Sequence, residues 1–254
     1  MVYFVGAGCG AVDLITVRGA KLLRLADLVI YAGSLVNSDL LDYCSPEAEI
    51  LNSATMTLED VLQAIYTAEN QGKRTVRLHS GDASLYGAIR EQMVELDNCG
   101  IDYEVVPGVS SMNGAAAAMQ VEYTLPGVSQ SVIVTRMAGR TPVPSNESIA
   151  ALAKHLTSMV IFLSAGMMPK LQQELLAGGY PADTPTAIAY KVSWPDELIL
   201  HCTVGTLAET GAKHGITRTA LILVGAFLSD KFDRSLLYDP QFSTMYRPGG
   251  NDAH

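Results

Sequence analysis

The chain has 254 residues, of which 48% are hydrophobic and 17% are charged. This composition is typical of a compact globular protein and excludes a disordered or low-complexity chain. The 17 Lys and Arg residues against 26 Asp and Glu residues give a net charge of -9. A broad cationic face for nucleic acid or for an anionic membrane is therefore disfavoured, and an anionic ligand must be met by local basic groups.

No apolar run reaches the ~18 residues that a membrane span requires, and the first residues lack the pattern of a signal peptide. We therefore expect a cytoplasmic protein. The four cysteines form no CxxC pair and the five histidines show no metal-ligand spacing, so we expect reduced thiols and no protein-bound metal.

Short apolar runs alternate with longer amphipathic stretches in the first half of the chain. Strands are expected at residues 2–5, 28–31, 75–79 and 103–106, and helices at 16–26, 58–70, 86–97 and 112–119. Because the strands are short, apolar and separated by helices, they predict an α/β domain with a mainly parallel sheet covered on both faces.

The pattern breaks at residues 120–130, which contain Pro126 and Gly127 and predict a domain boundary. We place an N-terminal domain at 1–122 and a second α/β domain at 123–254, with a polar tail from about residue 229 that frays at its end. Strands are expected there at 131–135, 159–163, 186–190, 198–202 and 220–224, and helices at 147–156 and 169–177. The short link at 192–197 indicates a hairpin and therefore a mixed sheet.

Three glycine-bearing loops each follow a predicted strand of the first half and lead toward a predicted helix. They lie at residues 6–11 (GAGCGA), 79–87 (HSGDASLYG) and 107–111 (PGVSS). Ligands of open α/β sheets bind at the carboxyl ends of strands, so these loops predict one binding crevice. Glycine lets the backbone approach a ligand closely, and hydrogen bonds are offered by Ser80, Ser84, Ser110 and Ser111.

The first loop also satisfies the GxGxx[GA] pattern of NAD and FAD sites. Such a site needs an acidic residue where the second strand ends. Here Asp27 precedes the apolar run and Ala32 follows it. A nicotinamide oxidoreductase is therefore disfavoured, and a tight turn that binds no ligand stays open as an alternative.

Several polar residues near these loops have two interpretations. Asp82 could accept hydrogen bonds from a ligand or cap the following helix, and Ser110 and Ser111 could bind a ligand or form an N-cap. His79 could move a proton or simply pack at its strand end. Trp194 could cover a flat ligand or pack on a neighbour. The sequence contains no ordered Ser/His/Asp or Cys/His set, so a covalent hydrolytic mechanism is not supported.

The segment 135–144 (TRMAGRTPVP) places Arg136 and Arg140 in an otherwise acidic chain. Arginine binds carboxylates through two parallel hydrogen bonds, so this segment is a candidate for holding a polyanionic substrate. A solvated surface charge is the alternative for each arginine. Further basic residues that could join it are Arg18, Lys191 and Arg218.

Taken together, these motifs resemble the tetrapyrrole methylases, whose methyl donor is S-adenosylmethionine. The glycine-loop motifs at 5–16, 80–87 and 107–111 carry the general resemblance. Three further motifs look like the precorrin-4 C11-methyltransferase branch of cobalamin synthesis: 31–36 (YAGSLV), 135–144 and 190–197 (YKVSWPDE). The match runs from about residue 2 to residue 228, and it departs from the family at Cys9, where proline is usual.

The resemblance implies two α/β domains with a ligand cleft between them, a tetrapyrrole substrate and a homodimer. Carried over by matching motif, the cofactor contacts would be Ser80, Gly81, Asp82, Leu85, Ser110, Ser111, Leu163, Ala189, Thr219 and Ala220. In such enzymes the first loop faces the tetrapyrrole. The substrate contacts would be Gly8, Gly10, Arg136, Arg140 and Lys191.

The implied reaction transfers a methyl group to C11 of precorrin-4 or cobalt-precorrin-4, with any cobalt arriving as part of the substrate. Asp82 and Tyr86 are the candidates for a catalytic role, and we expect Asp82 to contact the cofactor instead of moving a proton. A sister methylase acting on another ring carbon, for example of uroporphyrinogen III, is the nearest alternative. A nucleotide-binding oxidoreductase and a non-catalytic sensor are the alternatives from other classes.

Overall fold

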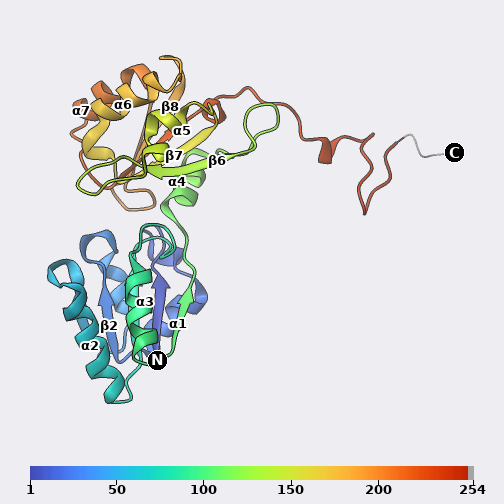
Figure 1. Cartoon of the computed structure of the whole chain (residues 1–254). Helices are drawn as coiled ribbons and strands as arrows, with labels where there is room; N and C mark the ends of the chain where they lie inside the picture. The colour runs from blue at the N-terminus through green and yellow to red at the C-terminus, as the bar shows by residue number, and fades with distance from the viewer. Residues whose placement is uncertain (251–254) are drawn as a thin grey trace. The chain divides into compact units, whose positions relative to one another are not determined.

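The computed structural model describes residues 1–250 and divides into two compact units (Figure 1). The first unit consists of Met1–Ala118 together with Lys191–Leu198. The second consists of Met119–Tyr190 and the chain from Ile199 onward. The last four residues of the expected frayed tail, 251–254, lie outside the described residues.

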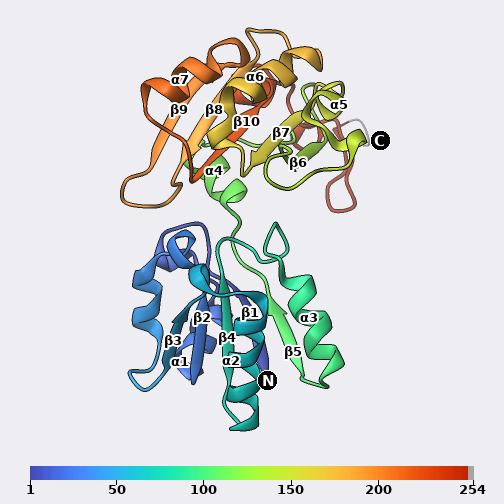
Figure 2. The same ribbon diagram turned by 60° about the vertical axis from the view of Figure 1, so that its left-hand side comes forward.

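A five-stranded sheet forms the centre of the first unit (Figure 2). Its strands are β1 (Val2–Gly6), β2 (Leu28–Tyr31), β3 (Glu49–Asn52), β4 (Thr75–His79) and β5 (Tyr103–Val106). They are all parallel and lie in the order β3-β2-β4-β1-β5. The prediction of a parallel sheet is confirmed, with one edge strand, β3, that the sequence pattern did not indicate.

Helices cover both faces of this sheet. They are α1 (Val17–Leu25), α2 (Leu58–Asn70) and α3 (Ile89–Asn98), whereas α4 (Ser111–Met119) follows β5 and belongs to neither of the apolar clusters on the two faces. One apolar cluster joins α1 to one face of the sheet, and a second joins α2 and α3 to the other. Side chains alternate between the faces along each strand, so both sides of a strand such as β1 are buried.

The start of α3 differs from the prediction, and that of α1 agrees with it within one residue. The helix expected at 86–97 begins only at Ile89, because Tyr86 and Ala88 have positive φ angles of 58° and 49°, which a right-handed helix does not allow. The first glycine loop leads into a 3-10 turn, and α1 starts after its N-cap Thr16, which accepts a hydrogen bond from the Gly19 amide.

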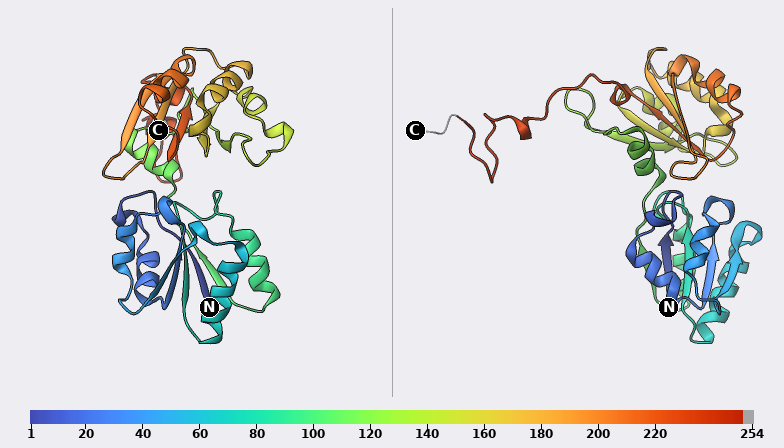
Figure 3. Two further views of the ribbon diagram at one scale, coloured as in Figure 1. Left: turned by 90° about the vertical axis from the view of Figure 1, so that its left-hand side faces the viewer. Right: turned by 180° about the vertical axis from the view of Figure 1, so that it is seen from behind.

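The second unit contains a five-stranded mixed sheet (Figure 3). Its strands are β6 (Val132–Arg136), β7 (Ser158–Phe162), β8 (Pro185–Tyr190), β9 (Leu198–Thr203) and β10 (Ala220–Val224). They lie in the order β6-β7-β10-β8-β9, with β6 parallel to β7 and with β10 antiparallel to both of its neighbours. The predicted mixed sheet is confirmed, and β8 and β9 are neighbours across the short link.

Three helices share the core of this unit with the sheet: α5 (Ile149–Ala153), α6 (Met168–Ala177) and α7 (Leu207–Lys213). The sequence pattern did not indicate α7. After Ser229 the chain forms a 3-10 turn and one isolated β-bridge, and it exposes large apolar side chains, namely Phe232, Leu236, Leu237, Tyr238, Phe242, Met245 and Tyr246. Among residues 1–250, no helix has both the length and the apolar character needed to cross a membrane.

Candidate active site

The three glycine loops of the first unit meet at the carboxyl ends of β4, β1 and β5, which are adjacent strands. Gly8 and Gly81 exchange two backbone hydrogen bonds, one from the Gly8 amide (3.2 Å) and one from the Gly81 amide (2.8 Å). A Cβ atom on Gly6 would lie 2.6 Å from the Gly108 Cα and 2.6 Å from the Gly81 carbonyl oxygen. Glycine is therefore required where the three backbones approach one another.

The carboxylate of Asp82 links the second loop to the third. It accepts hydrogen bonds from the Gly108 amide (2.7 Å), from the Ser84 amide (2.9 Å) and from the Ser84 hydroxyl. Partial burial alone would raise the pKa of Asp82, but these hydrogen bonds outweigh it and lower the pKa below its ordinary value. Asp82 is thus an ionised group that holds the loops in position, and it does not cap α3.

The serines of the second and third loops divide into two kinds. Ser110 is buried and caps α4, since its carbonyl accepts from the Asn113 amide (3.0 Å) and its hydroxyl lies 3.4 Å from the Met112 amide. Ser80 and Ser111 are half-buried, and their hydroxyls make no hydrogen bond with any residue in the described range 1–250. Both hydroxyls are available to a ligand beside Gly81.

The segment Lys191–Leu198 packs on the first loop. The Ser193 hydroxyl accepts a hydrogen bond from the Ala11 amide (3.0 Å) and lies 3.3 Å from the Cys9 sulfur. A Cβ atom on Gly10 would lie 2.3 Å from the Trp194 ring. Trp194 therefore packs on a neighbour, and the Cys9 side chain occupies the space that Ser193 and Gly114 leave.

The basic residues proposed for the substrate have different surroundings. The Arg136 guanidinium donates to the carbonyl oxygens of Met137 (3.1 Å), Thr141 (3.3 Å) and Pro142 (2.8 Å), which closes its own loop. Arg140 is exposed and has no hydrogen bond or ion pair within residues 1–250. Lys191 forms an ion pair with Asp196 at 2.5 Å. Arg140 is therefore the one of the three that has no partner in this range.

The residues proposed in the second unit gather at one end of three adjacent inner strands, β7, β10 and β8. Ala220 begins β10 and pairs with Tyr190 of β8, next to Ala189. Leu163 follows β7, the other neighbour of β10, and is 63% exposed. Leu163 and Thr219 both have positive φ angles, 52° and 54°. Such backbone conformations are uncommon outside glycine and collect at binding sites.

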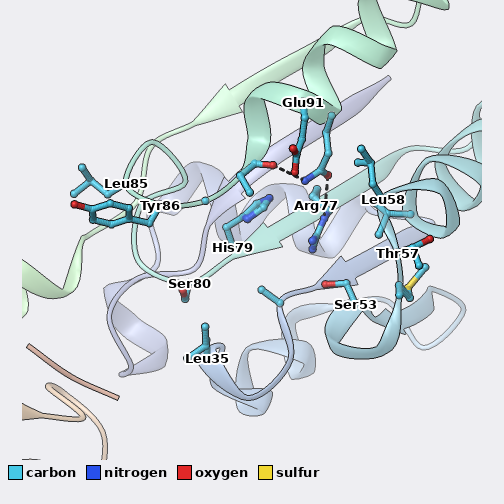
Figure 4. Close-up of a pocket in the computed structure, with 16 residues that line it drawn as sticks. Leu35, Ser53, Thr57, Leu58, Arg77, His79, Ser80, Leu85, Tyr86 and Glu91 are labelled. Atoms are coloured by element: carbon cyan, nitrogen blue, oxygen red, sulfur yellow. Dashed lines mark hydrogen bonds between the residues drawn. The ribbon is translucent and has the colours of Figure 1, made fainter. Parts of the chain in front are cut away.

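A pocket of about 270 Å³ lies in the first unit, beyond the ends of β2, β3 and β4 (Figure 4). Ser80, Leu85 and Tyr86 form one wall, so the pocket adjoins the second glycine loop. Its polar floor includes Arg77 and His79 of β4 (Figure 4). No group of three or more potential metal ligands occurs in the part of the chain that the structure describes.

Arg77 and His79 are deeply buried, with 7% and 4% of their surfaces exposed. Burial lowers the pKa of Arg77 to about 10, so its guanidinium stays charged at neutral pH. Burial and the nearby charge of Arg77 lower the pKa of His79 to about 3, so its imidazole is neutral. The sequence pattern left the role of His79 open and did not indicate Arg77. An arginine between the apolar residues Val76 and Leu78 of a predicted strand was the signal that could have indicated it.

Comparisons with known proteins agree with this architecture. A family model described as tetrapyrrole (corrin/porphyrin) methylases matches residues 1–208. The cobalt-precorrin-4 C(11)-methyltransferase of Methanocaldococcus jannaschii is 51% identical over 247 residues, which cover 97% of this chain and 95% of that protein. The precorrin-4 C(11)-methyltransferase of Mycobacterium tuberculosis is 45% identical over 239 residues, covering 93% and 95%.

A more distant relative is the uroporphyrinogen-III C-methyltransferase of Bacillus subtilis, which is 30% identical over 230 residues, covering 88% of this chain and 89% of that protein. Among solved structures, the X-ray structure of a cobalamin biosynthetic cobalt-precorrin-4 methyltransferase superposes with a TM-score of 0.88 at 46% identity. That match covers 90% of this chain and 95% of the other.

Proposed function

This chain belongs to the tetrapyrrole methylases, and from that membership we propose that it transfers a methyl group from S-adenosylmethionine to C11 of precorrin-4 or cobalt-precorrin-4. The observation that carries the proposal is near-full-length likeness to C11-methyltransferases, at 51% and 45% identity. The relative that acts on uroporphyrinogen III is only 30% identical, which favours the C11 reaction over that of a sister methylase.

S-adenosylmethionine, when bound, supplies an electrophilic methyl group on a sulfonium sulfur. The residues of the second and third glycine loops fit such a group. Ser80 and Ser111 offer hydroxyls with no partner in residues 1–250, and Gly81, with a φ of 62°, leaves the space between them without a side chain. Leu85 offers half-buried apolar surface beside them. Asp82 and Ser110 hold these loops in place.

In the second unit we propose Leu163, Ala189, Thr219 and Ala220 as further cofactor contacts. They lie at the same end of the adjacent strands β7, β10 and β8, where Leu163 and Thr219 adopt positive φ angles. Gly8 and Gly10 of the first loop, with Arg140 and Lys191, are proposed to contact the tetrapyrrole.

The reaction needs no strong general base, because C11 of the ring-contracted tetrapyrrole is an electron-rich carbon that attacks the methyl group directly. Catalysis then depends on holding the two reactants in line and on excluding water. An ionised Asp82 that accepts three hydrogen bonds suits a positioning role. Tyr86, which is 43% exposed at the pocket wall, is the side chain we propose to lie against the reactants.

The deciding experiment offers the purified protein methyl-labelled S-adenosylmethionine with precorrin-4 and, separately, with cobalt-precorrin-4, under anaerobic conditions. Mass spectrometry and NMR then locate the label. We expect label at C11, and the faster substrate identifies whether cobalt is present in the natural one. Binding of S-adenosylhomocysteine is measured in parallel by calorimetry.

Other outcomes separate the alternatives. Label at another ring carbon would identify a sister methylase. Tight binding of S-adenosylhomocysteine without any labelled product would indicate a non-catalytic sensor. Binding of NADH, followed by its fluorescence, would support an oxidoreductase. The geometry disfavours that class, because the backbone amide and carbonyl of Gly8 are both hydrogen-bonded to Gly81.

We also propose that the protein forms a homodimer. The exposed apolar side chains between Phe232 and Tyr246 favour burial against another surface. Size-exclusion chromatography with light scattering measures the molar mass, and we expect twice that of one chain.

A further inference from the structure

The face of β4 that is directed toward α2 and α3 is polar. Val76 and Leu78 belong to the apolar cluster on the α1 side, so the alternate residues Thr75, Arg77 and His79 point to the opposite side. All five residues of β4 are buried. A buried strand of a parallel sheet is normally apolar on both faces, so this polar face calls for a specific explanation.

Arg77 is a buried cation without a counterion. It forms no ion pair with any residue from 1 to 250. Its Nη1 donates to the Ile30 carbonyl oxygen (3.0 Å) and its Nε donates to Gln92 Oε1 (3.3 Å). Gln92 is held in turn by the Ala88 carbonyl (3.1 Å), as the dashed lines in Figure 4 show. The guanidinium is thus held in place by neutral groups, and its Nη2 is left for a ligand.

His79 adds a ring nitrogen that has no partner in the described range. Its Nε2 atom is buried and makes no hydrogen bond with any residue of the described range. Leaving such an atom unpaired costs free energy that a bound acceptor recovers. Arg77 and His79 lie two residues apart on the same strand face and both line the pocket.

The pocket has the size and the location for part of a larger ligand. Its volume of about 270 Å³ lies below the ~300–1,000 Å³ typical of sites that enclose a whole drug-sized molecule. It adjoins the proposed cofactor residues Ser80 and Leu85. The only other charged side chain in its lining is Glu91, which is exposed at the rim.

We propose that this pocket, which we call the Arg77 pocket, binds one carboxylate side chain of the tetrapyrrole, with Arg77 Nη2 and His79 Nε2 as the donors. The proposal rests on the proposed function for the identity of the ligand. A carboxylate matches a charged guanidinium and a neutral N–H, and bound there it supplies the counterion that Arg77 lacks. Arg77 and His79 then fix how the macrocycle lies beside the methyl donor.

The test measures equilibrium binding and needs no turnover. Uroporphyrin, a stable porphyrin with eight carboxylates, is titrated into the protein and followed by its absorbance and fluorescence, and its octamethyl ester serves as the uncharged comparison. We expect the acid to bind and Arg77→Gln to weaken that binding by about 10- to 100-fold, as loss of a charge-assisted hydrogen bond does. His79→Phe should weaken it less, and His79→Gln, which keeps a donor, should restore it in part.

Two matched variants control for charge and for folding. Glu91→Gln removes the negative charge at the rim and should leave binding unchanged or make it tighter. Arg90→Gln removes an exposed positive charge from the same helix, outside the pocket lining, and should have no effect. Affinity for S-adenosylhomocysteine reports whether each variant is folded. If Arg77→Gln does not fold, His79→Phe and the spectra of the unchanged protein carry the test.

A measurement on the unchanged protein completes it. In ¹⁵N-histidine NMR spectra, uroporphyrin should shift the Nε2 resonance of His79. An unmoved resonance, or unchanged affinity in folded Arg77→Gln and His79→Phe, overturns the proposal. So does an equal shift with millimolar inorganic phosphate alone, which would indicate a site for free anions.

Failure of the pocket and failure of the function give different results. Methyl transfer to C11 with an unchanged KM for the tetrapyrrole in Arg77→Gln would contradict the proposed carboxylate site and support the proposed function. Arg77-dependent binding of uroporphyrin without any methyl transfer would support the carboxylate site and contradict the proposed function.

Discussion

Asp82 and His79 lie three residues apart, yet their surroundings give them opposite roles. Asp82 accepts three hydrogen bonds and keeps its charge, because those donors stabilise the carboxylate. His79 has no hydrogen-bond partner for Nε2 among residues 1–250 and loses its charge, because burial and Arg77 both oppose protonation. Neither group is therefore suited to exchange a proton near neutral pH, which agrees with a reaction that needs alignment more than acid-base catalysis.

His79 predicts a defined pH dependence of stability. Its pKa is about 3 in the folded chain against 6.5 unfolded, so between these values the unfolded state binds more protons. Stability should therefore fall as the pH drops below about 6.5, by at most ~1.4 kcal/mol per pH unit from this group. Urea unfolding of wild type and His79→Gln at pH 7, 6 and 5 measures the difference, and the variant should show the shallower dependence.

The exposed His201 provides the control, since His201→Gln should keep the wild-type slope. Asp82, whose pKa is lowered on folding, loses its stabilising charge only below this window. The charged groups in the pocket that faces His79 are Arg77 and Glu91. Equal slopes in wild type and His79→Gln would contradict the prediction.

At the scale of elements, the sequence pattern predicted strands better than helix ends. The strands β1, β2, β4 and β5 are short segments rich in apolar and β-branched residues, and they were expected within a residue of their observed bounds. β3 was not expected, because only two of its four residues are apolar and it lies at the sheet edge. α3 starts late because the Tyr86 and Ala88 backbones follow the glycine loop instead of the amphipathic pattern.

The glycine loops could be predicted as a group because each is a local motif at a strand end. The Arg77 pocket could not, because it is built from separate elements. Its donors come from β4, the groups that hold Arg77 come from β2 and α3, and its rim comes from α2, the second loop and Glu91 of α3. These elements come together only through tertiary packing, so no local spacing of residues in the sequence predicts the pocket.

The close approach of the three loops can be tested at Gly6. Gly6→Ala places a Cβ atom 2.6 Å from two backbone groups, and backbone cannot yield as a flexible side chain can. We expect a loss of about 1–3 kcal/mol or more in the free energy of unfolding and a weaker affinity for S-adenosylhomocysteine. Gly139→Ala, where the new Cβ atom would lie 3.4 Å from a methionine Cε, should change stability by less than ~0.5 kcal/mol. Equal effects would contradict the packing argument.

The arginine loop separates structural from binding arginines. Arg136→Ala removes three hydrogen bonds to carbonyl oxygens and should lower the free energy of unfolding by about 1–2 kcal/mol. Arg140→Ala removes no hydrogen bond or ion pair within residues 1–250 and should leave stability within ~0.5 kcal/mol while raising the KM for the tetrapyrrole. Thermal unfolding and steady-state kinetics measure the two effects. A stability loss in Arg140→Ala with unchanged KM would reverse the assignment.

At the scale of the whole molecule, the two units are not continuous in the sequence. Lys191–Leu198 joins β8 to β9 of the second sheet, yet its contacts place it in the first unit. Ser193 and Trp194 there cover the first glycine loop. The first unit is therefore completed by residues that come late in the chain, and the cover of Gly10 depends on them.

This arrangement makes the single tryptophan a reporter of the first unit. Trp194 lies against Gly10, so its fluorescence should change when the first unit unfolds. In urea, Gly6→Ala should move the fluorescence midpoint to lower concentration. Leu175 lies in the fully buried core of the second unit, so Leu175→Ala should lower the free energy of unfolding by about 2–5 kcal/mol. It should move the unfolding midpoint seen by circular dichroism to lower urea concentration and leave the fluorescence midpoint in place. A fluorescence midpoint that follows Leu175→Ala and ignores Gly6→Ala would show that Trp194 belongs to the second unit, and a single transition moved by both would show that the two units unfold together.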